Sequence, residues 1–151
     1  MQSAFDAMAV YPLPEEQIAK ELPADAPIAV RIEAYKKAVN AAISPAGQQA
    51  LAAYCNSISI SETPASHVSD LYKELAGLEA AAGQYTEAEE HLRLALQFDP
   101  KSTPAYCELA KLFEKEKRTA EAVELLKAAL VVPGTDSIHK SIIRDWIRDL
   151  S

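Results

Sequence analysis

Residues 69–102, SDLYKELAGLEAAAGQYTEAEEHLRLALQFDPKS, and residues 103–136, TPAYCELAKLFEKEKRTAEAVELLKAALVVPGTD, decide the fold of this chain of 151 residues. When one segment is laid over the other, eleven of the 34 aligned positions are identical. Composition alone predicts roughly three or four matches in a chain so rich in Ala and Leu. The excess indicates an internal repeat. The identical pairs are Tyr72/Tyr106, Glu74/Glu108, Leu75/Leu109, Ala76/Ala110, Leu78/Leu112, Glu87/Glu121, Ala88/Ala122, Glu90/Glu124, Leu92/Leu126, Ala95/Ala129 and Leu96/Leu130.

The spacing within each copy predicts two amphipathic helices. Most of the matched residues are apolar or small and recur at intervals of three, four or seven, which is the period of a helix and not of a strand. Thr103 followed by Pro104 predicts an N-cap and a first helical turn. Thr86 with Glu89 predicts a capping box, and Gly83 predicts a left-handed residue that ends the preceding helix. Each copy is therefore expected to be a helical hairpin.

These residues resemble the tetratricopeptide repeat family, whose pattern joins an aromatic residue, Leu and a small residue in the first helix to Ala, a bulky apolar residue and Ala in the second. Two positions depart from the pattern. Glu79 stands where the family often has an aromatic residue, and Lys117 stands where the first copy has Gly83. The small residues that let the helices approach remain, and a bulky side chain at Ala76, Ala88 or Ala95 is expected to cost about 1 to 3 kcal/mol. The family positions are Tyr72, Leu75, Ala76, Ala88, Leu92, Ala95 and Pro100 in the first copy, and Tyr106, Leu109, Ala110, Phe113, Ala122, Leu126 and Ala129 in the second.

The flanking segments are expected to complete the stack. Residues 137–151 form a capping helix with a charged outer side, and residues 26–68 form a degenerate helical hairpin and a connector that ends at Thr63 and Pro64. The 1–25 segment precedes them. The resemblance thus implies an all-α, right-handed helical-hairpin solenoid in one domain, with two repeats over 69–136. The expected packing faces are Ile138, Ile142, Ile143, Trp146, Ile147 and Leu150 at the C-terminal end, Ile28, Ile32, Tyr35, Val39 and Ile43 in the first helix, and Leu51, Tyr54, Cys55 and Ile58 in the second.

Composition limits the classes of partner. The net charge of −7 divides into −3 for residues 1–68 and −4 for residues 69–151, so it is dispersed along the chain. Dispersed negative charge repels phosphate backbones and anionic lipids, which argues against nucleic acid and membrane insertion. Cys55 and Cys107 have neither the spacing of a disulfide framework nor that of a zinc site. Together with the lack of a leader pattern in the first fourteen residues, this predicts a cytoplasmic protein or an excised fragment of a larger one.

The sequence offers little chemistry. Its four glycines cannot form a phosphate loop, and no nucleophile elbow or HExxH helix occurs. The three histidines lie on different predicted elements, which argues against a metal site. We therefore expect no enzyme, no cofactor and no metal, although an unfamiliar catalytic site stays a third hypothesis. Glu87, Glu89 and Glu90 suit the first turn of a helix. The basic residues Lys111, Lys115, Lys117 and Arg118 suit a solvated turn better than an anion site, and Cys107 is placed off the packing face.

The resemblance implies a function in binding a protein or a peptide. In this family the first helix of each repeat lines a concave groove, so a scaffold or adaptor module is expected, and a structural self-assembly unit is the alternative. A clamp for the carboxylate tail of heat-shock chaperones is not expected. Lys73 suits such a clamp, but Gly77 stands where Asn is wanted and Glu108 would repel the carboxylate. The positions carried over to the groove are Asp70, Lys73, Gly77, Ala80, Cys107, Lys111 and Glu114.

Overall fold

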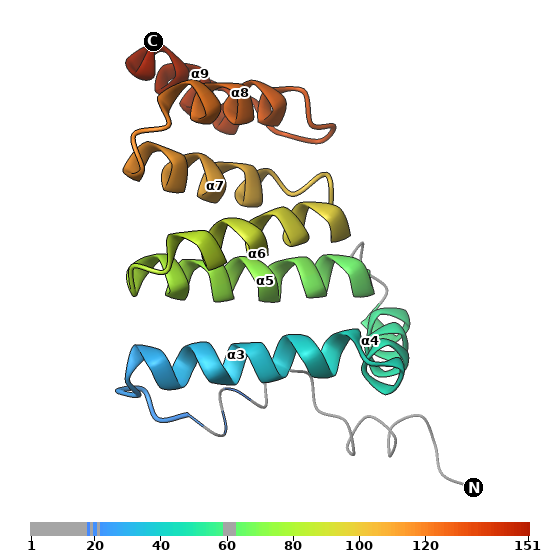
Figure 1. Cartoon of the computed structure of the whole chain (residues 1–151). Helices are drawn as coiled ribbons and strands as arrows, with labels where there is room; N and C mark the ends of the chain where they lie inside the picture. Colours follow the sequence, from blue (N-terminus) through green and yellow to red (C-terminus); the bar gives the residue numbers. More distant parts are fainter. Residues whose placement is uncertain (1–17, 19, 21, 59–62) are drawn as a thin grey trace, which may run out of the picture.

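The computed structural model describes residues 18, 20, 22–58 and 63–151, and in these parts it contains seven α-helices of a stacked solenoid. Figure 1 shows α3 and the helices α5 to α9 layered in chain order, with α4 to one side of the stack. No strand occurs among the described residues, and the expected all-α helical-repeat solenoid is confirmed. Most of the 1–25 segment, at residues 1–17, 19 and 21, and residues 59–62 of the connector lie outside this part. The helices are α3 (Ile28–Ile43), α4 (Pro45–Ile58), α5 (Pro64–Ala81), α6 (Tyr85–Phe98), α7 (Thr103–Lys115), α8 (Thr119–Leu130) and α9 (Ser137–Leu150).

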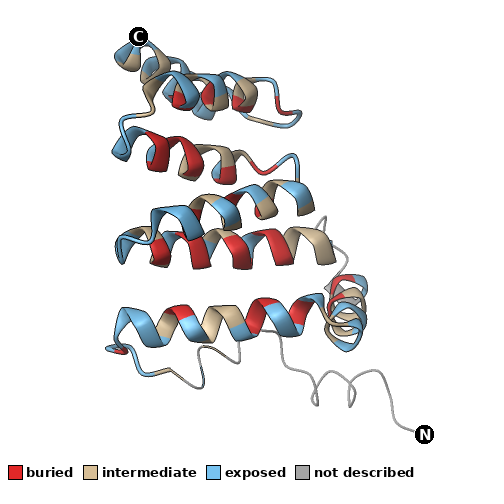
Figure 2. Cartoon of the chain, in the orientation of Figure 1, coloured by how far each residue is buried: buried red, intermediate tan, exposed pale blue. Residues whose placement is uncertain are grey.

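The two copies of the sequence repeat are two helical hairpins, α5 with α6 and α7 with α8. Five of the identical pairs are buried in both copies, with at most 3% of any residue exposed. Figure 2 shows the buried residues on the sides of the helices that face neighbouring layers. The alanines among them have no room for a larger side chain, which explains why spacing predicted the packing. The five pairs are Leu75/Leu109, Ala76/Ala110, Ala88/Ala122, Leu92/Leu126 and Ala95/Ala129.

The turns inside the hairpins repeat the same geometry. Gly83 has φ 82° and Lys117 has φ 62°, so both end a helix in the left-handed conformation. The next amide closes the turn, with Gln84 N donating to Glu79 O at 2.8 Å in one copy and Arg118 N donating to Phe113 O at 2.7 Å in the other. This is the Schellman arrangement. The prediction for Gly83 is confirmed, and Lys117 adopts the same conformation despite its side chain.

Two of the predicted N-caps are wrong by one or two residues. α6 begins at Tyr85 with Gln84 at the N-cap and no side-chain cap bond, so Thr86 and Glu89 do not form a capping box. α7 is capped by Ser102, whose hydroxyl accepts from Ala105 N at 3.3 Å, and not by Thr103. The residue before the expected cap supplies the oxygen because the chain enters the helix one residue earlier. Thr63, by contrast, caps α5 as expected.

The N-terminal helices depart from the expected hairpin. α3 packs more extensively on α5 than on α4, and Figure 1 shows α4 seen nearly end-on beside α3. Ser44 is extended before Pro45, and a Cβ on Gly47 would lie 1.9 Å from Ala41 O, so only glycine permits this tight turn. Ile28 and Ile43, expected on the packing face, are 37% and 36% exposed.

α9 covers the other end of the stack. Asp136 caps it by accepting from His139 N at 2.8 Å, and Ile143 is buried against the core of the second repeat. Trp146, Ile147 and Leu150 pack partly against the same core. The capping position is therefore as predicted, but Ile138 and Ile142 were wrongly placed on the packing face. They are 70% and 57% exposed because the helix turns a narrower apolar stripe toward α8 than the sequence pattern suggested.

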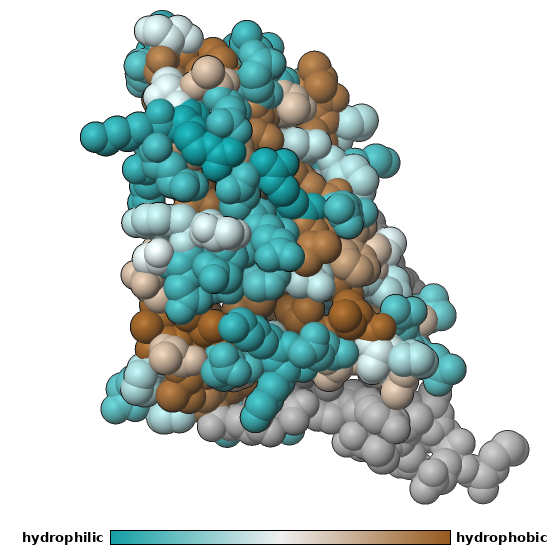
Figure 3. Space-filling model, in the orientation of Figure 1, coloured by the Kyte–Doolittle hydropathy of each residue, from teal (hydrophilic) through white to brown (hydrophobic). Residues whose placement is uncertain are grey.

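The surface is largely polar on the face that Figure 3 shows, with apolar side chains visible between hydrophilic ones. Of the helices in the described parts, none has both the length and the apolar character that crossing a bilayer requires.

Candidate functional site

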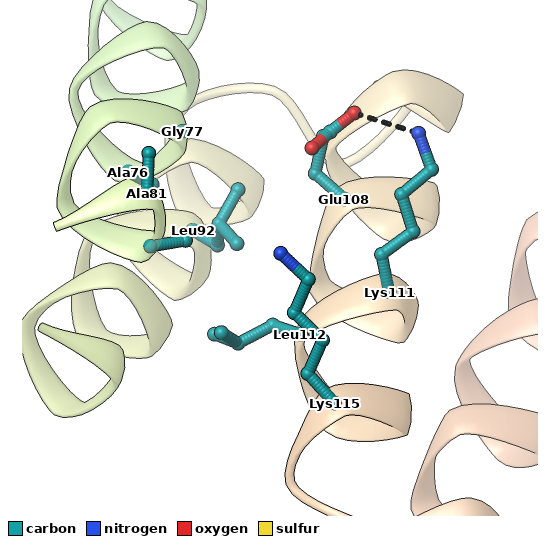
Figure 4. A pocket seen from close by; sticks show the side chains of 9 residues that line it. Ala76, Gly77, Ala81, Leu92, Glu108, Lys111, Leu112 and Lys115 are labelled. Atoms are coloured by element: carbon teal, nitrogen blue, oxygen red, sulfur yellow. Dashed lines mark hydrogen bonds and ion pairs between the residues drawn. The ribbon is translucent and has the colours of Figure 1, made fainter. Parts of the chain in front are cut away.

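A hollow of about 150 Å³ lies between the first helices of the two repeats. α5 contributes small residues to one wall, α7 contributes the opposite wall, and α6 contributes Leu92 to the floor. Figure 4 shows this arrangement from close by. The residues that line the hollow are Ala76, Gly77, Ala80, Ala81, Leu92, Glu108, Lys111, Leu112 and Lys115.

The hollow exists because α5 carries small side chains along this face. A Cβ added at Gly77 would meet no atom within 4 Å, so the space in front of this residue is open. In the second copy the equivalent position is Lys111, whose side chain is long and exposed. The first copy of the repeat therefore has open space at Gly77, where the second copy has the charged side chain of Lys111. A side chain of moderate size from a binding partner fits into the space that Gly77 of α5 leaves open.

The rim of the hollow is charged. Lys111 Nζ lies 3.3 Å from Glu108 Oε1, in a pair whose side chains are 57% and 41% exposed. Such exposed pairs contribute little to stability and exchange partners readily. Lys115, one turn further along α7, pairs with no acceptor in the described residues, and Figure 4 shows its ammonium group pointing into the space between the helices. The rim therefore presents one available cation and one weakly held cation.

The structure brings together three of the seven residues carried over from the family. Gly77, Ala80 and Lys111 line the same hollow. Asp70, Lys73 and Cys107 are not among its lining residues. The seventh residue, Glu114, accepts a hydrogen bond from Trp146 Nε1 at 3.1 Å and so links α7 to α9.

Cys107 belongs to the core side of α7, contrary to the placement expected from the sequence. It is half-buried and packs against the core of the second repeat. Burial raises the pKa of its thiol, which keeps the thiol protonated and unreactive at neutral pH.

Two further charged residues line the hollow. Glu108 was expected there only as a residue that opposes a carboxylate clamp, and Lys115 was not expected there. Lys115 had been assigned to a solvated basic turn. The signal that could have identified it is the i, i+4 spacing from Lys111, which places both side chains on one face of α7.

Arg118 is tied into contacts between the repeats. Its guanidinium donates to Glu121 Oε2 at 2.6 Å and to Glu89 Oε2 at 2.9 Å, and it lies 3.9 Å above the centre of the Phe113 ring. Hydrogen bonding to Arg118 lowers the pKa of both carboxyl groups. Glu89 therefore joins the first repeat to the second, in addition to lying near a helix start. Because these carboxylates already pair with the guanidinium of Arg118, the turn provides no anion site at that residue.

The histidines are separate, as the sequence indicated. His91 Nδ1 lies 2.5 Å from Glu79 Oε1, and His139 Nδ1 lies 2.8 Å from Asp136 Oδ1. His67 packs edge-on against Tyr54. Within the described ranges no three metal-ligating side chains gather at one point.

Stacked helical hairpins with a hollow between their first helices define an α-helical repeat solenoid. Residues 79–137 match the family model of the tetratricopeptide repeat, from the end of α5 to the start of α9. The resemblance found in the sequence is thereby confirmed for this stretch. Repeats of this family generally mediate protein–protein interaction. Among curated proteins, none matches the chain.

Proposed function

We propose that the chain is a scaffold or adaptor module that binds a short segment of a protein partner in the groove between α5 and α7. The observation that carries the proposal is the open space at Gly77 beside the ammonium group of Lys115. An apolar side chain of the partner fills the hollow over Leu92 and Leu112, and a neighbouring acidic side chain pairs with Lys115. In a chain of net charge −7, this local positive rim favours an acidic segment over a basic one.

Asp70, Lys73 and Cys107 stay predictions for the flanking residues of the peptide, and Glu114 for its far end. Two free cysteines, one of them buried, support a reducing compartment, so we infer a cytoplasmic location. The acidic net charge supports protein rather than nucleic acid as the partner. The module acts by binding and needs no catalytic step.

The test is a selection of random heptapeptides displayed on phage against the whole chain, followed by titration of the enriched peptides. The expected peptides carry an acidic residue next to an apolar one. Gly77→Leu fills the hollow and is expected to abolish their binding. Because Gly77 lies inside a helix with open space around it, the replacement also stabilises the fold by about 0.5 to 1 kcal/mol. Loss of binding then cannot be attributed to unfolding.

A matched control is Ala120→Leu, which adds the same side chain at an exposed position of α8 outside the groove. Peptides that bind Gly77→Leu as tightly as the unaltered chain contradict the proposal, as do enriched peptides without an acidic residue. An EEVD-ending peptide tests the separate expectation that no chaperone tail is clamped. Glu108 lies in the groove and opposes the C-terminal carboxylate of such a tail, which the internal acidic residue of the expected peptides does not carry. Micromolar binding that is lost when this carboxylate is amidated would show that expectation to be wrong.

A second candidate function is self-association through α9. Ile138 and Ile142 are 70% and 57% exposed, and their i, i+4 spacing places them on one face of the helix. Two copies that pair α9 with α9 remove both residues from water. Sedimentation of the whole chain at rising concentration tests this, with Ile142→Lys expected to restore a monomer. A concentration-independent monomer for the unaltered chain removes the candidate.

A further inference from the structure

A second cavity, of about 230 Å³, lies away from the groove among α3, α5 and α6. Three of its lining residues are apolar, and the other four carry polar groups. One water needs about 10 to 15 Å³ of space of this kind, so the cavity has room for considerably more than one water. It is therefore the size of a small organic molecule. The lining residues are Lys36, Val39, Asn40, Tyr72, Leu75, His91 and Leu94.

Behind one wall of this cavity lies a buried acid–imidazole pair. Glu79 is 0% exposed and does not line the cavity, and its Oε1 lies 2.5 Å from His91 Nδ1. Because a carboxylate can only accept, Nδ1 donates to it and the ring is held in one orientation. Tyr72 stacks on the imidazole at 5.7 Å between ring centres. The free nitrogen of His91 is consequently Nε2, on a residue that lines the cavity.

Three polar groups at the cavity have no hydrogen-bond partner in the described parts of the chain. They are His91 Nε2, the side-chain amide of Asn40 and the hydroxyl of Tyr72, a residue only 7% exposed. Burial raises the pKa of Tyr72, so its hydroxyl stays neutral and can donate. Lys36 adds an ammonium group, which lies 3.5 Å from Glu33 in an exposed pair. Asn40 is exposed, His91 is partly buried and Tyr72 is buried, so the three groups stand at the mouth and wall of the cavity, where a ligand that enters it can reach them.

The repeat itself does not require these polar residues. In the second copy Phe113 stands at the position of Glu79 and Leu125 at that of His91, while Tyr106 retains the aromatic ring of Tyr72. A buried ion pair is generally no more stabilising than apolar residues of similar volume. The first repeat thus replaces an apolar pair by a polar one without a gain that packing explains. Departures of this kind are expected at functional sites.

We propose that this cavity binds a small organic carboxylate of about the size of benzoate. Lys36 and the Tyr72 hydroxyl donate to the carboxylate, and His91 donates through Nε2 when its ring is protonated beside Glu79. The amide of Asn40 completes the polar end. Val39, Leu75 and Leu94 surround the apolar body of the ligand. The site is independent of the peptide groove and does not rest on the function proposed for it.

The test is an NMR titration of the whole chain with benzoate and, in parallel, with its uncharged isostere benzamide. Benzoate is expected to shift the resonances of His91 and Tyr72, with benzamide at least about tenfold weaker, as expected for loss of a hydrogen bond to a charged group. Tyr72→Phe and Lys36→Met are each expected to weaken benzoate binding by about tenfold. Lys37→Met is the matched control, since Lys37 lies next along α3 but does not line the cavity. Equal binding of the two probes, or equal loss in both lysine variants, overturns the proposal.

A double variant guards against the effects of disturbed folding. Glu79→Met with His91→Leu replaces the polar pair by apolar side chains, as the second repeat has at these positions, and is expected to stay folded while losing benzoate binding. Unchanged binding by this folded variant contradicts the role of His91. A blocked pentapeptide with a central glutamate is titrated as well. If the peptide binds at this cavity and benzoate does not, the carboxylate comes from a protein partner and the small-ligand proposal is wrong.

Discussion

Removing one member of the Glu79–His91 pair is expected to destabilise the chain far more than removing both. His91→Leu leaves the carboxylate of Glu79, which is 0% exposed, without its partner. Loss of one partner of a buried pair costs about 3 to 5 kcal/mol. Glu79→Met leaves the partly buried imidazole with an unpaired Nδ1, at about 1 to 3 kcal/mol. The sum of the two single effects is therefore about 4 to 8 kcal/mol, comparable to the whole stability of many domains.

The double variant Glu79→Met/His91→Leu is expected to be as stable as the unaltered chain, or more stable by about 1 to 4 kcal/mol, because no charge is then left unpaired. Urea unfolding, followed by helix content, measures all four proteins. With a slope near 2 kcal/mol per molar, His91→Leu lowers the midpoint by about 2 M. The reasoning is refuted if His91→Leu costs less than about 1 kcal/mol, or if the double variant is less stable than both single variants.

Three further predictions concern the turns, the packing and the contact between repeats. Lys117→Gly relieves a left-handed non-glycine residue and is expected to stabilise the fold by about 1 kcal/mol, whereas Gly83→Ala destabilises it by about as much, both measured by urea unfolding. Ala88→Leu overpacks a site with 0% exposure and lowers the free energy of unfolding by about 1 to 3 kcal/mol. Arg118 lowers the pKa of Glu89 from 4.5, so this carboxyl group contributes stability above that value that is lost as the pH falls through the lower folded pKa. Arg118→Gln is therefore expected to flatten the loss of stability below about pH 5, and an acid limb of unchanged slope contradicts this.

The sequence period predicted the hairpins because the features that determine them are local and repeated. Alanines at fixed intervals allow only close-packed helices, and Ala88 and Ala95 are indeed fully buried. A left-handed residue at Gly83 follows from its missing side chain. Helix starts were less predictable. Gln84 opens α6 with no side-chain cap, so the backbone of the preceding turn, and not a capping residue, determines where that helix begins.

The pattern of apolar residues could not predict the direction of α4. The pattern of apolar residues predicted two helices, and both exist, but a hairpin requires a particular turn between them. That turn depends on the close approach of Gly47 to the backbone of Ala41, a contact that no periodicity reveals. The apolar face of α3 consequently meets α5, where Ile32 and Val39 join the core of the first repeat.

The sequence indicated only one of the two residues of the acid–imidazole pair. Glu79 was noticed as a departure from the family pattern, but its partner lies twelve residues further on, across the hairpin. A comparison of the two copies would have identified this partner. The positions of Glu79 and His91 are polar in the first copy, and both are apolar in the second, at Phe113 and Leu125. Paired changes between internal repeats indicate contact as directly as spacing indicates a helix.

The same comparison explains why α9 works as a cap. Ser137 follows Thr103 by 34 residues, so α9 starts at the same position of the repeat as α7, and Ile143 occupies the buried position of Leu109. The next position, however, is Arg144, where the two repeats have Ala76 and Ala110. Those alanines lie in the core that the second repeat shares with its neighbours, with 1% and 0% exposure. A helix stacked on α9 in the same way would bury the guanidinium of Arg144, which is exposed. An unpaired buried charge costs several kcal/mol. Arg144 in place of alanine therefore prevents another helix from stacking on α9, and this face of α9 stays exposed to solvent.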